Sequence, residues 1–184
     1  MSDFWGLSDG DTVQATTSYE SAGGSIEPIP DGTQVLASID EAKWDSRDGE
    51  EYISLRWAVL QPDTYKNRKV FQKLWVLGNN PAQSDMDKRK KQGDNAKKML
   101  AAIDTNAGGK LLAKGGKPTD TDLQSSLMGK PMILRLAVWE MTGSDGATMN
   151  GNWVQQVAAK SGGNVQEAQK PVAQKESEED FIPF

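Results

Sequence analysis

The strict alternation of apolar and polar residues between Glu51 and Leu60 most limits what this chain can fold into. The apolar residues occupy every second position: Ile53, Leu55, Trp57 and Val59. Because successive side chains of a strand point to opposite faces, this pattern predicts a strand with one face in a core. Tyr52 and Arg56 fall on the opposite face, which we expect to be exposed.

Four further segments have the composition of strands. They are residues 33–44, 68–77, 131–141 and 152–158. The same alternation predicts which of their residues face inward: Val35, Ala37 and Ile39 in the first segment, Val70, Leu74 and Val76 in the second, and Met132, Leu134, Leu136 and Val138 in the third. The outward positions are then Phe71, Lys73 and Trp75 in the second segment and Arg135 and Trp139 in the third. Clusters of Gly, Asp and Asn between the segments predict turns.

A helical stretch separates the third strand from the fourth. From Ser84 onward, Ala96, Met99, Leu100 and Ile103 recur at helical spacing, and Asp85 and Asp87 suit a first helical turn. Gly93 is expected to divide this stretch into two helices. A basic, Gly-rich loop is predicted over 108–117. After it, Thr119 and Asp122 have the spacing of a capping box, and Gly129 marks the end of a short helix.

Three strands, a helical insertion and two more strands form the element order of an OB-fold. We therefore expect an all-β protein with inserted helices, in which a five-stranded barrel carries the helical insertion between strands 3 and 4. Small barrels of other kinds share parts of this order. The predicted organisation is an acidic N-terminal arm (1–32), the OB-fold domain (33–160) and a disordered acidic C-terminal tail (161–184).

Charge is distributed unevenly along the chain, although the formal net charge is −5. Residues 1–32 contain six acids and no base, whereas residues 66–117 contain thirteen bases and four acids. A cationic centre between anionic ends is suited to binding a polyanion, with the tail competing for the same surface.

Aromatic and cationic side chains share the predicted outward faces of the strands. Single-stranded DNA binding needs both, because cations follow the phosphates and flat rings stack on unpaired bases. The candidate DNA-binding residues are Arg47, Tyr52, Arg56, Lys66, Arg68, Lys69, Phe71, Lys73, Trp75, Arg135 and Trp139. The alternative for Trp75 and Trp139 is that they pack beneath the helical insertion.

Other functional classes lack the residues they need. The chain contains no Cys and no His, so thiolate or imidazole metal sites and a His proton shuttle are absent. The acidic pairs Asp85 with Asp87 and Asp120 with Asp122 are interpreted as helix caps, not magnesium ligands. We expect no enzymatic activity, no cofactor and no metal. With no signal region and no long apolar run, we also expect an intracellular protein without membrane association.

The sequence ends with an acidic run followed by an apolar tip. These residues are Glu178, Glu179, Asp180, Phe181, Ile182, Pro183 and Phe184. This ending resembles the C-terminal tip of bacterial single-stranded-DNA-binding proteins, in which acids precede a final Ile-Pro-Phe. Phe181 departs from that pattern by separating the acids from the tripeptide. The resemblance implies that the tip recruits host replication, repair and recombination proteins.

The body of the chain also looks like phage-encoded single-stranded-DNA-binding proteins. This similarity rests on residues 53–60, 69–76 and 99–104 as strand, strand and helix. It implies a sequence-independent binder of single-stranded DNA, monomeric or dimeric, that acts in phage DNA replication and recombination in the cytoplasm of a bacterial host. Two alternatives stay open: an adaptor or decoy that displays the tip without DNA affinity, and a strand-annealing recombinase.

Overall fold

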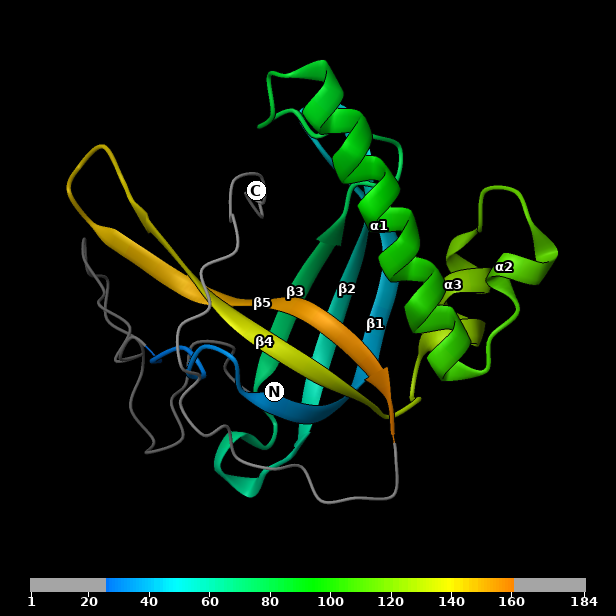
Figure 1. Ribbon diagram of the computed structural model, residues 1–184, viewed down its shortest axis with the longest axis horizontal. Coiled ribbons are helices and arrows are strands. Elements are labelled where there is room, and N and C mark those ends of the chain that lie inside the picture. The colour runs from blue at the N-terminus through cyan, green and yellow to red at the C-terminus, as the bar shows by residue number, and fades with distance from the viewer. Residues whose placement is uncertain (1–25, 161–184) are drawn as a thin grey trace, which may run out of the picture.

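The computed structural model describes residues 26–160, so the predictions for residues 1–25 and for the tail, including the tip at 178–184, lie outside the described part. The strands are β1 (Gln34–Arg47), β2 (Glu50–Gln61), β3 (Lys69–Leu74), β4 (Met132–Thr142) and β5 (Thr148–Ala159). They form one antiparallel sheet in the order β3-β2-β1-β4-β5 (Figure 1). The expected mostly-β fold with five strands and inserted helices is confirmed.

The hairpin between β1 and β2 is tighter than the sequence suggested. Arg47 pairs with Glu50, which leaves only Asp48 and Gly49 as the turn. Both have positive φ, 53° and 81°, the conformation of a two-residue turn whose twist matches that of the adjoining strands. An Asp-Gly pair adopts this backbone at low cost, so β1 extends three residues beyond its predicted end at Trp44.

The predicted inward faces form the core. The four alternating apolar residues of β2 are fully buried, as are Met132, Leu134 and Leu136 of β4, whereas Val138 is only half-buried. One polar residue of β3, Gln72, also faces inward and is 9% exposed. Its Oε1 accepts a hydrogen bond of 2.9 Å from Nε1 of Trp57, which satisfies the buried indole.

The helical stretch is one continuous helix, α1 (Met86–Ala107), so the prediction that Gly93 divides it is wrong. Asp85 caps the helix by accepting hydrogen bonds from the backbone N–H groups of Asp87 and Lys88. Gly93 instead allows close packing, because a Cβ at this position would lie 2.8 Å from Cα of Gly78. Gly93 therefore allows the helix to contact the loop at Gly78, and it does not interrupt the helix.

The predicted basic loop 108–117 contains a short helix, α2 (Leu111–Lys114), and is followed by α3 (Asp120–Leu127). The capping box of Thr119 and Asp122 is present as predicted. Trp44 of β1 holds this region to the sheet: its Nε1 donates to the carbonyl of Pro118 over 2.8 Å, and Nζ of Lys117 lies 4.3 Å from its ring centre. These contacts fix the insertion against the end of the first hairpin.

Segment 26–33 packs against the sheet. Ile29 is 1% exposed and belongs to the core, although the sequence placed it in the arm. The side chain of Asn152 on β5 clamps its backbone: Ile29 N–H donates to Oδ1 over 2.8 Å, and Nδ2 donates to the Ile29 carbonyl over 2.7 Å. Next to it, Asp31 accepts a hydrogen bond from the Val138 backbone.

The strands at the two ends of the sheet order, β3 and β5, approach each other, with Cα atoms within 8 Å. Helix α1 contacts both of them, while α3 contacts β1 (Figure 1). The helical insertion therefore covers the region where β3 and β5 approach each other. None of the helices at positions 26–160 is long and apolar enough to cross a membrane.

Candidate nucleic-acid interface

On the outer face of β3, the aromatic ring of Phe71 lies between the lysine side chains of Lys69 and Lys73. Lys69, Phe71 and Lys73 alternate with buried residues along the strand and point away from the core. Phe71 is 64% exposed, more than any other large apolar side chain in the described strands. Pairing with β2 places Arg56 directly opposite Phe71 and Ser54 opposite Lys73. The structure thus brings Arg56, Lys69, Phe71 and Lys73 together, as the sequence predicted.

Two of the rings expected on this face are buried. Tyr52 is 5% exposed and Trp75 is 2% exposed, so the prediction that these rings are exposed is wrong. Their ring centres lie 4.6 Å apart, and Nζ of Lys73 lies 5.2 Å from the Tyr52 ring. For Trp75 the alternation fails because β3 ends at Leu74, one residue earlier. The structure gives no base access to either ring in this conformation.

The buried environment of Tyr52 changes the ionisation of its hydroxyl group. Burial, together with the neighbouring Asp45 carboxylate, raises its pKa above the ordinary value. Its hydroxyl donates a hydrogen bond of 3.2 Å to Oδ2 of Asp45. Nε1 of Trp75 is buried, and no hydrogen-bond acceptor is present for it in the described part of the chain. Tyr52 thus contacts a carboxylate through its hydroxyl and the amino group of Lys73 through its ring.

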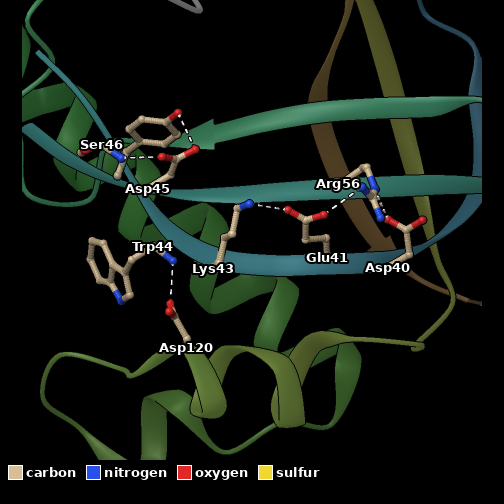
Figure 2. Close-up of polar contacts among 9 residues, drawn as sticks. Asp40, Glu41, Lys43, Trp44, Asp45, Ser46, Arg56 and Asp120 are labelled. Carbon is tan, nitrogen blue, oxygen red and sulfur yellow. Dashed lines mark hydrogen bonds and ion pairs between the residues drawn. The ribbon is translucent and has the colours of Figure 1, made fainter. Parts of the chain in front are cut away.

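Two acidic residues of β1, which the sequence reasoning did not consider, lie on the same outer face. Nε of Arg56 is 2.7 Å from Oδ1 of Asp40, and Nη1 of Arg56 is 2.8 Å from Oε2 of Glu41 (Figure 2). Lys43 pairs with the other oxygen of Glu41 over 2.8 Å, and Lys69 pairs with Asp40. The positive charges of Arg56 and Lys69 are therefore partly neutralised. Lys73, in contrast, forms no ion pair with any of the residues described at positions 26–160.

These contacts shift the ionisation of the acids. Partial burial alone would raise the pKa of Asp40, but hydrogen bonds from Lys69 and Arg56 outweigh it and the pKa lies below its ordinary value. The hydrogen bond from Lys43 lowers the pKa of Glu41. Both groups are carboxylates at neutral pH, so they remain negative beside any phosphate that approaches the face.

A β-bulge explains how two consecutive residues reach one face. The register shifts between Ile39 and Glu41, with Ile39 opposite Trp57 and Glu41 opposite Arg56, so Asp40 is the extra residue. A sequence signal existed: the residues of β1 that belong to the core are at 35, 37, 39 and then 42. This change of spacing from two to three at Ala42 marks the bulge.

The remaining predicted DNA-binding residues are dispersed. Arg47 is exposed at the first hairpin, 3.7 Å from Asp48, and Lys66 is exposed in the connection between β2 and β3. Arg68 donates to the carbonyl of Glu27 over 2.6 Å. Arg135 is half-buried on β4, opposite Gln34 and Gln156. None of these four lies in the cluster around Phe71.

Trp139 also lies apart, on the β4–β5 hairpin. It pairs with Gly151 of β5 and is half-buried, and a Cβ on that glycine would lie 2.9 Å from atoms of the indole. Residues 136–159 contain Glu140 and Asp145 and no Lys or Arg. The surroundings of Trp139 therefore do not attract phosphate, unlike those of Phe71.

A separate open cavity of about 300 Å³ lies between α1, α2 and α3. Its charged lining consists of Lys110, Lys114, Lys130 and Asp122, and Lys114 pairs with Asp122 over 2.6 Å. None of the predicted DNA-binding residues lines it. Within residues 26–160, no group of three or more acidic side chains is placed to hold a metal ion.

No protein-family model matches the sequence, and comparison with curated proteins gives no similar protein.

Proposed function

We propose that the protein binds single-stranded DNA without sequence preference through the outer face of β2 and β3. The observation that carries this proposal is the exposure of Phe71 between Lys69 and Lys73. An unpaired base can stack on an exposed ring, and the amino group of Lys73, two residues away, can neutralise a phosphate.

The proposed architecture is the OB-fold barrel. Support comes from the sheet order, from the position of α1 between β3 and β4, and from the approach of β3 to β5 that would complete a closed wall. In this fold, oligonucleotides bind the surface formed by the second and third strands. Phe71 lies on that surface of the present chain.

The C-terminal tip would then recruit partners while the sheet holds DNA. Its resemblance to the tip of bacterial single-stranded-DNA-binding proteins supports a role in phage DNA replication and recombination in the bacterial cytoplasm, with host replication and repair proteins as partners. This part of the proposal rests on sequence, because residues 178–184 lie outside the described part. No catalytic step, cofactor or metal is proposed.

A labelled oligothymidine titration at about 50 mM and about 200 mM salt tests DNA binding. Wild-type affinity should fall steeply with salt, because phosphate contacts release counterions. Phe71→Ala should weaken binding about fivefold or more with the salt slope unchanged, since one base stack contributes about 1 to 3 kcal/mol. Lys73→Gln should reduce the salt slope by about 1.

Two variants serve as matched controls. Leu112→Ala removes another exposed apolar side chain, 69% exposed on α2, and Lys130→Gln removes another exposed lysine. Both should bind like the wild type. If the wild type does not bind at the lower salt concentration, or if the Phe71 and Leu112 variants behave alike, the proposed interface is wrong.

The adaptor function has one structural argument in its favour. Tyr52 and Trp75 are buried, and the carboxylates of Asp40 and Glu41 lie on the face that DNA would occupy. An adaptor that displays the tip needs neither exposed rings nor a cationic sheet. A gel shift with a long single-stranded oligonucleotide separates the two functions, because only the DNA-binding protein retards it.

A further inference from the structure

Arg56 lies opposite Phe71 in the candidate interface, and two of its three guanidinium nitrogens already contact carboxylates. Its Nε is bound to Asp40 and its Nη1 to Glu41, from two consecutive residues of β1 (Figure 2). Its side chain is still 36% exposed. These two contacts leave Nη2 and the faces of the guanidinium plane unoccupied by the carboxylates.

This arrangement makes Arg56 a poor phosphate contact. A phosphate that reached Nη2 would also approach two carboxylates that bind the same guanidinium. The five groups Lys43, Arg56, Lys69, Asp40 and Glu41 have a combined formal charge of only +1. Phosphate neutralisation is better provided by Lys73, for which the described residues include no ion pair.

We propose that the guanidinium plane of Arg56 is a second base-stacking surface beside Phe71, held in position by Asp40 and Glu41. This inference rests on the proposed DNA binding. Guanidinium groups are planar and weakly hydrated, and unpaired bases stack on them. A hydrogen bond to Asp40 and an ion pair with Glu41 restrain the rotation of the plane, so less side-chain entropy is lost when a base stacks on it.

The sheet register places the two surfaces side by side. Arg56 and Phe71 are direct cross-strand partners, whose Cβ atoms in an antiparallel pair lie about 4.5 to 5.5 Å apart. Two neighbouring bases can thus each find a flat partner on one face. The bulge at Asp40 is part of this arrangement, because without it only one of the two carboxylates would reach Arg56.

The test compares Arg56→Lys on two ligands: labelled oligothymidine and an oligonucleotide of the same length made of abasic nucleotides. Lysine keeps the charge and loses the plane. Binding of Arg56→Lys to oligothymidine should be about 5-fold to 10-fold weaker than wild type, and the difference should disappear on the abasic ligand. Arg89→Lys is the matched control, since Arg89 lies on α1 and is not one of the candidate DNA-binding residues, and it should equal wild type on both ligands.

A second variant, Arg56→Gln, removes the charge. The quantity measured for it is the slope of DNA affinity against salt concentration. The slope should equal that of the wild type, whereas Lys73→Gln lowers it by about 1. The inference is overturned if Arg56→Lys binds oligothymidine like the wild type, if its loss is the same on the abasic ligand, or if Arg56→Gln lowers the slope by about 1. Absence of wild-type binding would instead refute the proposed function.

Discussion

At the residue scale, a predicted exposure was correct where the residue lay within a regular strand and no neighbour from another segment covered it. Phe71 lies inside β3, and alternation correctly placed it outside the core. Trp75 lies one residue beyond the end of β3, where alternation no longer applies, and it is buried. Tyr52 lies inside β2 on the outward face, yet it is covered by contact with Trp75. Its burial depends on a neighbour from another segment, which periodicity does not describe.

Asp122 provides a prediction about acid stability. A hydrogen bond from Lys114, and further ones from Thr119, lower its pKa from 3.8 to about 2. A carboxyl whose pKa is lowered by folding stabilises the folded state above its unfolded pKa, and this stabilisation is lost as the pH falls through the folded pKa. We therefore expect the contribution of Asp122 to disappear between about pH 4 and about pH 2.

The measurement is the thermal midpoint of unfolding across this pH range. Asp122→Asn and Lys114→Gln should each show a smaller decrease than the wild type on acidification, because the first lacks the titrating group and the second lacks its main partner. Equal decreases for all three proteins would contradict the assignment.

At the scale of elements, glycine had opposite roles at positions that look similar in sequence. Gly49 is in a tight turn with positive φ, as expected of Asp-Gly. Gly93 lies inside α1 without interrupting it, because the helix approaches the backbone at Gly78. Sequence alone indicates a break for an isolated glycine in a helix, since glycine has a low helical propensity. Only the position of the neighbouring loop reveals the packing role.

Gly93→Ala tests that role. Alanine would favour the helix by about 1 kcal/mol, but its Cβ would lie 2.8 Å from Cα of Gly78, a backbone atom that cannot move away without shifting the loop. We expect a net loss of about 1 to 3 kcal/mol in the free energy of unfolding, typical of overpacking.

Asn95→Ala on the exposed side of the same helix is the control and should be neutral or slightly stabilising. Denaturant unfolding of the three proteins gives both values. A Gly93→Ala variant as stable as the wild type would show that the close approach imposes no constraint.

At the scale of the whole molecule, the separation of charges along the chain predicts competition between the acidic tail and DNA. The described part includes the basic segment 66–117, whereas residues 161–184 contain five acids and two bases. If the tail occupies the cationic surface part of the time, removing residues 178–184 should leave DNA affinity unchanged or increase it, most at low salt, where charges are screened least.

The measurement is a titration of the wild type and the truncated protein with the same oligonucleotide at low and high salt. The control is replacement of Glu178, Glu179 and Asp180 by the corresponding amides, which keeps the length and the apolar tip. Marked weakening of DNA binding in the truncated protein would show that the tip belongs to the DNA site.

The sequence by itself determined the five strands, the position of the helical insertion, the helix caps and most of the core, because these depend on periodicity and on local backbone chemistry. It also determined that Phe71 and Lys73 share an exposed face. The tertiary structure alone decided the burial of Tyr52 and Trp75, the packing of Gly93 on Gly78, and the neutralisation of Arg56 by Asp40 and Glu41. The physical reason is that each of these depends on contact between segments whose relative placement no local pattern specifies.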